Sequence, residues 1–185
     1  LMMLAWLFHS LIWSYLLLFI SQRLGQSLSN ISWLMTLNAI VGMVAAFLGG
    51  AIADRFGRKG VMVLSLALSA VGWFFYRSAG NLPVFALLMV ITGATTPLYR
   101  LAADAMVADL VPVEKRLDAY SMLRMWNNLG VALGPAIGGF LVSVSYFVTF
   151  SVIGIGFAVI AVLVGLLVAE TGRHRQEKSE KPQAS

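Results

Sequence analysis

Six long apolar blocks, separated by short polar connections, run through most of this chain of 185 residues. Most of them reach the roughly 20 residues that an α-helix needs to cross about 30 Å of hydrocarbon. Backbone hydrogen bonds must be satisfied inside lipid, and the blocks do not alternate as barrel strands would, so each is expected to be a helix. The blocks are Leu1–Ile20, Ile31–Ala53, Gly60–Phe75, Leu82–Leu110, Leu117–Val142 and Tyr146–Ala169.

The composition agrees with an all-α, polytopic membrane protein. The chain is 59% hydrophobic and only 11% charged, whereas a soluble domain is about a quarter charged. Its net charge of +5 does not indicate nucleic-acid binding, because the basic residues lie at the ends of apolar blocks. With no cysteine, only two histidines and no phosphate-binding glycine loop, the chain is expected to hold no metal or cofactor and not to be an enzyme.

The charges of the connections predict the topology. Nine basic residues fall on one side, and only Arg23 and Arg77 fall on the other. The positive-inside rule places the nine, with the N- and C-termini, in the cytoplasm of a cell whose plasma (inner) membrane holds the protein. We expect a membrane bundle over residues 1–170 and a polar cytoplasmic tail or start of a linker over 171–185. The nine are Arg55, Arg58, Lys59, Lys115, Arg116, Arg173, Arg175, Lys178 and Lys181.

Two motifs carry a family resemblance. The junction after the second block reads Gly50-Ala51-Ile52-Ala53-Asp54-Arg55-Phe56-Gly57-Arg58-Lys59. It resembles the G-x-x-x-D-R-x-G-R-K signature of the major facilitator superfamily of secondary transporters. The fifth block contains a row that resembles the G-x-x-x-G-P-x-x-G-G motif of the superfamily's antiporters, especially drug/proton exporters. That row consists of Gly130, Gly134, Pro135, Gly138 and Gly139.

The resemblance implies the first half of a twelve-helix transporter, a six-helix bundle built from inverted three-helix repeats. The second half is either part of the same chain or a second copy in a homodimer. The implied function is secondary active transport of a small molecule across the bilayer by alternating access, with proton-coupled export favoured. An uptake symporter for a sugar, peptide or metabolite, or a half-size membrane scaffold without transport, is the alternative.

The family also implies a latch. In relatives, the positions matching Asp54 and Arg58 interact with an acid at the cytoplasmic end of the fourth helix, where Asp109 lies here. This cluster is expected to hold the outward-open state and to release in the inward-open state. Gly57 is expected to permit a tight turn and Gly50 a close helix contact; Arg55 and Lys59 complete the motif. The alternative is a solvated surface ion pair that contributes about 0–1 kcal/mol.

Three charged residues inside the blocks suggest coupling. Arg100 and Asp104 share a helix face because they are four residues apart, and Arg124 lies in the next block. Charges within a bilayer are costly and usually face a partner or a water-filled cavity, so all three are expected to meet. Asp104 would take up a proton and free an arginine, or the surplus positive charge would bind an anionic part of a substrate. The alternative is a structural polar clasp with arginines that reach the interface.

Other polar residues are assigned lesser roles. His9 lies in the first block, where it would carry protons or, as we favour, serve as a structural hydrogen-bonding group. The family arginine of the fourth helix falls on Met89, and the first helix lacks the acid of many exporters, so their proton route is not carried over. The antiporter glycines are expected to pack against the opposing bundle and prevent leak. Residues that are expected to bond to substrate or to a neighbouring helix are Asn38, Trp126, Asn127 and Asn128.

Overall fold

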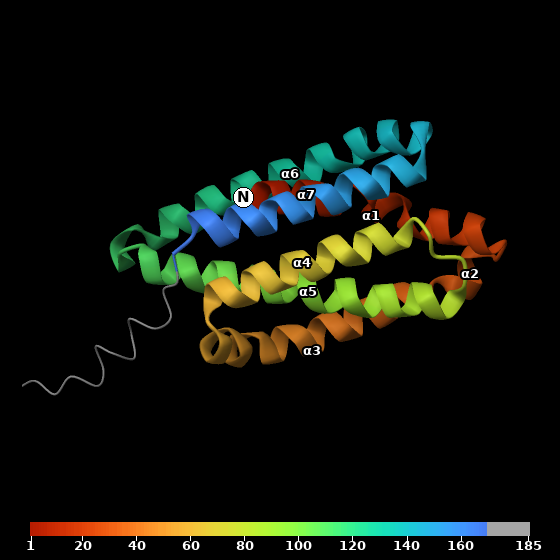
Figure 1. Cartoon of the computed structure of the whole chain (residues 1–185). Coiled ribbons are helices and arrows are strands. Elements are labelled where there is room, and N and C mark those ends of the chain that lie inside the picture. The colour runs from red at the N-terminus through yellow and green to blue at the C-terminus, as the bar shows by residue number, and fades with distance from the viewer. Residues whose placement is uncertain (170–185) are drawn as a thin grey trace, which may run out of the picture.

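The computed structural model describes residues 1–169 as a bundle of long helices lying side by side (Figure 1). Six spans within these residues are long and apolar enough to cross a membrane, which confirms the predicted all-α class. The tail predicted over 171–185 lies outside the described residues. The elements are α1 (Met2–Leu24), α2 (Leu28–Ile31), α3 (Trp33–Phe56), α4 (Arg58–Tyr76), α5 (Leu82–Leu110), the 3₁₀ turn η1 (Val113–Lys115), α6 (Arg116–Val144) and α7 (Tyr146–Leu167).

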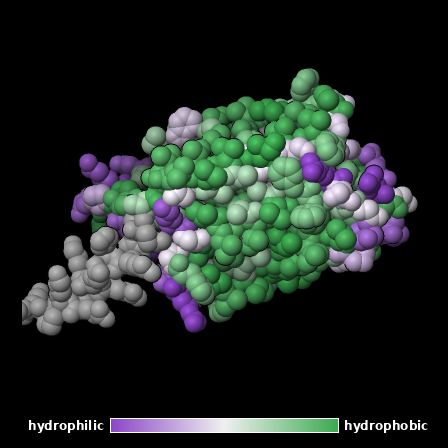
Figure 2. Space-filling model, in the orientation of Figure 1, coloured by the Kyte–Doolittle hydropathy of each residue, from purple (hydrophilic) through white to green (hydrophobic). Residues whose placement is uncertain are grey.

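The surface divides into an apolar band and two polar ends. Figure 2 shows the band covering the middle of one face, with hydrophilic residues at both ends of the helices. Most helices run a few residues past the predicted blocks, as α3 does in continuing beyond Ala53 to Phe56. The bounds of α5 match the prediction, and α7 ends at Leu167, short of the predicted Ala169. Such extensions are expected because a helix does not have to stop where hydrocarbon gives way to water.

Local sequence fixes the helix ends. Gly25 closes α1 in the left-handed region at φ 64°, and Gly57 separates α3 from α4 at φ 84°, a conformation that glycine adopts without a Cβ clash. The side chain of Asn81 accepts a hydrogen bond from the Val84 amide at 3.0 Å and caps α5. α5 ends before Pro112, since a proline disfavours helical backbone in the residue that precedes it.

The helix pairing has an internal symmetry. The main contacts join α1 to α6, α3 to α5, and α4 to both α5 and α7. The first three spans (α1, α3 and α4) can be matched in order with the last three (α5, α6 and α7). The contact between α1 and α6 then corresponds to the contact between α5 and α3. This pairing fits the predicted inverted three-helix repeats, because an odd number of spans reverses the direction of the second repeat.

Aromatic side chains fill the centre of the bundle, while two helices are poorly covered. Trp73, Tyr76 and Phe150 stack with ring centroids 5.1–6.2 Å apart and are almost fully buried. By contrast, α3 and α6 carry large side chains on the outside, such as Phe47, 88% exposed, and Phe140, 71% exposed. These two helices therefore have faces that the described residues leave uncovered.

Candidate functional site

A charged cluster joins the ends of α3, α4 and α5. The guanidinium of Arg58 donates to the carboxylate of Asp109 and, at 2.7 Å, to the carbonyl of Ala105. Its second terminal nitrogen lies 3.8 Å from an Asp54 carboxylate oxygen. The predicted association of Asp54, Arg58 and Asp109 is thus present in the structure.

The two acids of this cluster differ in their surroundings. Side-chain exposure is 11% for Arg58 and 18% for Asp109, but 73% for Asp54. Exposed pairs are strongly screened by water, so the Arg58–Asp109 contact dominates. It also connects positions 51 residues apart in the sequence, whereas Arg58 and Asp54 are neighbours one helical turn apart.

The remaining motif residues take mixed positions. Gly57 adopts the positive φ that the tight turn requires, as predicted. Arg55 lies over the Phe56 ring at 5.6 Å, and Lys59 is half-buried in the first turn of α4. The close helix contact predicted for Gly50 is wrong, because nothing lies within 4 Å of where its Cβ would be. Gly49, one residue earlier, makes that contact, against Leu98 and Leu101 of α5.

A cavity of about 860 Å³ is lined by all three charged residues of the predicted coupling group. Arg100 and Asp104 reach it from α5, and Arg124 reaches it from α6. The three charges therefore line one space, as predicted, yet Asp104 makes no ion pair within 4 Å in the part of the chain that the structure describes. Other lining residues are Trp6, Leu117, Tyr120, Ser121, Leu123, Asn127, Asn128 and Val131.

Helical phase decides which predicted polar residues face this cavity. Asn127 and Asn128 follow Arg124 by three and four residues, so they share its face. Trp126, two residues from Arg124, is 40% exposed and does not line the cavity. Asn38 lies elsewhere and donates to the Met89 carbonyl at 2.8 Å, which ties α3 to α5.

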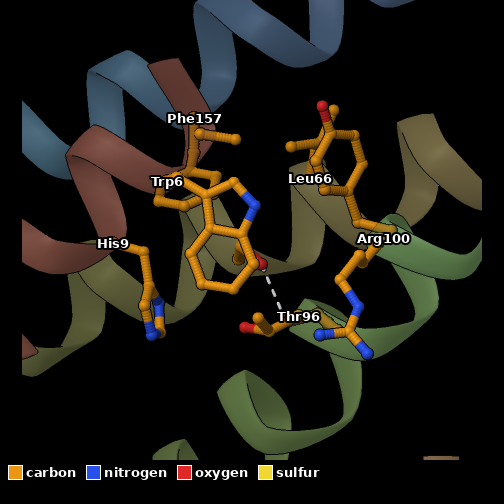
Figure 3. A pocket seen from close by; sticks show the side chains of 10 residues that line it. Trp6, His9, Leu66, Thr96, Arg100 and Phe157 are labelled. Carbon is orange, nitrogen blue, oxygen red and sulfur yellow. Dashed lines mark hydrogen bonds between the residues drawn. The ribbon is translucent and has the colours of Figure 1, made fainter. Parts of the chain in front are cut away.

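His9 lies in a small aromatic pocket beside this cavity. Its ring stacks on Trp13 with centroids 5.0 Å apart, and in Figure 3 it lies on the opposite side of the pocket from Arg100. The pocket has about 20 Å³, enough for about one water molecule, and shares Trp6 and Arg100 with the charged cavity. The structure gives His9 aromatic contacts and no hydrogen bond within residues 1–169, so the expected structural hydrogen bond is not found.

The glycine row of α6 faces α1. A Cβ at Gly130 would lie 2.7 Å from the Met3 carbonyl, and one at Gly138 would overlap the Leu11 backbone. A Cβ at Gly134 would overlap Ser10 in the same way. Gly139 follows the same row and lies beside Tyr15. The predicted packing of these glycines against an opposing bundle is therefore wrong: they permit close packing within this bundle.

Hydroxyl groups strengthen the same interface. The Tyr15 hydroxyl donates to the Pro135 carbonyl at 3.0 Å, and the Ser10 hydroxyl donates to the Gly130 carbonyl at 3.1 Å. Both acceptors belong to the glycine–proline row, whose glycines let the backbones of α1 and α6 approach closely. Hydrogen bonds of this kind between helices stabilise membrane bundles modestly, typically by about 0.6 kcal/mol.

Sequence reasoning missed several residues of the site. Tyr120 donates its hydroxyl to the Asp104 carbonyl at 2.8 Å and so ties α6 to α5 beside the cavity. The sequence contained a signal for Tyr120, because this residue precedes Arg124 by four positions and so shares its helix face. Trp6 precedes His9 by three residues and has the same kind of signal. The hydrogen bond between Ser69 and Thr95, at 2.7 Å, had no such signal.

Comparison with known proteins gives one family. A family model described as Major Facilitator Superfamily matches residues 1–185. An uncharacterized MFS-type transporter, YqjV of Bacillus subtilis (strain 168), is 30% identical over 128 residues, which are 67% of this chain and 30% of that protein. The quinolone resistance protein NorA of Staphylococcus aureus (strain Mu50) is 29% identical over 123 residues, 66% of this chain and 32% of NorA. The matched part is thus about a third of each relative.

Proposed function

The chain belongs to the major facilitator superfamily, a family of transporters and not of enzymes, and from this premise we propose that it forms part of a secondary active transporter. The proposed transporter moves a small solute across the plasma (inner) membrane by alternating access, with both termini in the cytoplasm. The observation that carries this proposal is that three charged side chains of α5 and α6 line one cavity, while the Arg58 cluster ties the end of the same α5 to α3 and α4. A cavity that opens alternately needs such a breakable contact among its surrounding helices.

The Arg58 cluster is proposed as the latch. Arg58, Asp54 and Asp109 join the ends of three helices through hydrogen bonds and ion pairs that a small rotation of α4 would break. Gly57 permits the turn around which this rotation occurs. Arg55 and Lys59 add positive charge at the same end and favour its cytoplasmic location.

A second six-helix half is proposed to cover α3 and α6. These spans are the least buried, with 17% of their apolar windows covered inside the described bundle, against 39–50% for the other four. The covering half belongs to the same polypeptide or to a second copy. Mass spectrometry of the untagged native product distinguishes the two: a mass near twice 20.0 kDa supports one polypeptide, and a mass near 20.0 kDa supports a pair.

Proton-coupled export is proposed as the mode of transport. The glycine–proline row in α6 is similar to the antiporter motif, and NorA is named for quinolone resistance. Asp104 is the acid that lines the cavity, and we propose that its protonation is coupled to movement of the solute. His9, in the neighbouring aromatic pocket, is assigned a packing role.

Symport is the second candidate mode, favoured by one observation. Arg100 and Arg124 line the same cavity as Asp104 and oppose the entry of a cation that would compete with a proton for this carboxylate. An anionic solute meets no such opposition, and protonation of Asp104 removes the negative charge that would repel it, so the proton and an anionic solute would bind together.

Flux in proteoliposomes tests the proposed function. The purified native protein is reconstituted, a pH gradient of either sign is imposed, and movement of a fluorescent quinolone is followed with an internal pH dye. Antiport predicts solute movement against the proton flow, and symport predicts movement with it. The Asp104→Asn protein is expected to lose the response to the gradient, whereas Lys115→Gln, in the exposed turn η1, keeps it. Flux in Asp104→Asn with unchanged pH dependence would exclude Asp104 as the coupling residue.

A further inference from the structure

The charged cavity contains more positive than negative charge. Arg100 and Arg124 face it from two different helices, and Asp104 is the acid that faces it with them. Neither guanidinium makes an ion pair or a hydrogen bond with any residue between positions 1 and 169. The net charge of the lining is therefore +1, from two arginines and one aspartate.

This imbalance contrasts with the other arginines of the bundle. Arg58 contacts two carboxylates, and Arg77 lies 4.9 Å from the rings of both Phe74 and Phe147. Arg23 donates to the Ala79 carbonyl at 3.2 Å. The fold thus gives these side chains partners of its own and leaves the two cavity arginines with open hydrogen-bonding positions.

We infer that the cavity binds a carboxylate-bearing organic anion with a flat apolar body, a substrate class that deepens the proposed transport function and rests on it. Each guanidinium offers a planar fork of N–H donors that matches a carboxylate. The bound anion neutralises the surplus charge, so the occupied cavity carries no net charge. A volume of about 860 Å³ lies within the roughly 300–1,000 Å³ range of small-molecule sites.

Neighbouring side chains account for the rest of the ligand. Trp6 lines both this cavity and the small aromatic pocket of His9 and Phe157, and so gives a flat ring an apolar surface to pack on. Asn127 has a buried amide oxygen without a hydrogen-bond partner, and Asn128 adds a second amide. These amides are available to polar groups on the ligand beyond its carboxylate.

A cationic ligand fits this cavity poorly. Asp104 is the only carboxylate that a cation would find in its described lining, and it shares that lining with two guanidinium groups that repel the cation. The same geometry makes Asp104 unfavourable for an anion. Neutralising Asp104 is therefore expected to strengthen anion binding and not to abolish it.

Equilibrium dialysis with a matched pair of probes tests the inference. The native protein in lipid nanodiscs is titrated with 2-naphthoate and with 2-naphthamide, which differ in charge and have nearly the same shape. We expect naphthoate to bind at least about tenfold more tightly, as hydrogen bonds to a charged group imply. Arg100→Gln and Arg124→Gln are each expected to weaken naphthoate binding about tenfold or more, and Asp104→Asn to strengthen it several-fold. Lys115→Gln removes the same charge from the exposed turn η1 and is expected to change binding less than about twofold.

Further variants and outcomes keep the test decisive. Arg124→Lys keeps the charge and removes the planar fork, so it should retain the preference for naphthoate with a lower affinity, and it replaces Arg124→Gln if that variant does not fold. Equal binding of acid and amide would overturn the inference. Tighter binding of 2-naphthylmethylammonium, lost in Asp104→Asn, would also overturn it in favour of a cation site. The inference would also be overturned if protein that is active in the flux assay did not bind naphthoate at millimolar concentration. If the native protein showed no flux at all, the result would count against the proposed function instead.

Discussion

The Arg58 guanidinium donates to the Ala105 carbonyl at 2.7 Å while it also pairs with Asp109, one helical turn further along α5. One side chain from the start of α4 thus grips both the backbone and a carboxylate at the end of α5. Both contacts come from the same terminal nitrogen, Nη1, while Nη2 lies 3.8 Å from an Asp54 carboxylate oxygen. The planar guanidinium thus reaches α5 and α3 at once, whereas a lysine ammonium acts as a single point charge. This geometry supports the latch role proposed for the signature motif, which substitution can test.

Arg58→Lys and Asp109→Asn are each expected to reduce transport about tenfold while the protein still inserts normally. Hydrogen bonds to charged groups contribute roughly 1.5–3 kcal/mol, enough to shift an equilibrium between two conformations by that factor or more. Asp54→Asn is expected to have a smaller effect, because the Asp54 side chain is 73% exposed and exposed pairs contribute about 0–1 kcal/mol. Initial flux rates at equal protein content measure the difference.

The absence of cysteine from the chain gives this prediction a second readout. A single cysteine introduced at Val113, which is 68% exposed in η1, reports access to this end of the bundle through its alkylation rate. The latch predicts a changed alkylation rate in Asp109→Asn and little change in Asp54→Asn. Wild-type flux and wild-type alkylation in both Arg58→Lys and Asp109→Asn would contradict the latch.

Gly138→Ala is expected to destabilise the bundle, and Gly50→Ala is the matched control. A Cβ at Gly138 would overlap the backbone of Leu11, so α1 and α6 must separate, at a cost of about 1–3 kcal/mol for overpacking. Gly50 has nothing within 4 Å of its Cβ position, and its replacement should keep or slightly raise stability, because alanine favours a helix more than glycine does. Thermal unfolding in detergent, monitored by size-exclusion chromatography, measures the stability of both variants. Equal midpoints for Gly138→Ala and the wild type would mean that the α1–α6 packing is looser than the structure describes.

Much of the fold and part of the site were predictable from the sequence. Block length and hydropathy determine the six spans, because lipid leaves the backbone no alternative to a helix. The Arg58–Asp109 contact was predictable only through the family motif, since nothing local relates residues 51 positions apart. The direction of the glycine row was not predictable, because a row of small residues specifies a close contact and not the identity of the neighbouring helix.

Helical phase explains why some of the predicted polar residues line the cavity and others do not. From Arg124, steps of three and four residues lead to Tyr120, Asn127 and Asn128, all of which line the cavity, and exclude Trp126. The sequence contains this spacing, but it does not show that Arg124 faces the cavity. That becomes clear only when α5 is seen to line the same cavity as α6. Asn38 had no comparable anchor, and its contact with Met89 became evident only from the packing of α3 on α5.

Asn38→Ala is expected to lower stability slightly and to leave transport intact. Asn38 donates to the Met89 carbonyl at 2.8 Å and to the Thr92 hydroxyl at 3.3 Å, both on α5, and does not line the charged cavity. Loss of hydrogen bonds between membrane helices costs about 0.6 kcal/mol on average. The unfolding midpoint should therefore fall by a few degrees, while the flux rate per folded molecule stays within about twofold. A large loss of flux with unchanged stability would instead identify Asn38 as a substrate ligand.

His9→Phe is expected to preserve both folding and the pH dependence of flux. The His9 ring stacks on Trp13 at 5.0 Å with an interplanar angle of 27°, and its centroid lies 6.1 Å from that of Trp73. A phenyl ring keeps these aromatic contacts, which contribute about 0.5–1.5 kcal/mol each, and removes the titratable nitrogens. His9→Ala, which loses the ring, should lower the unfolding midpoint and so confirms that the contacts matter. Flux measured from pH 5.5 to 8 decides between the two roles: a displaced profile in a well-folded His9→Phe protein would place His9 on the proton path, because only the ring's ability to titrate has changed.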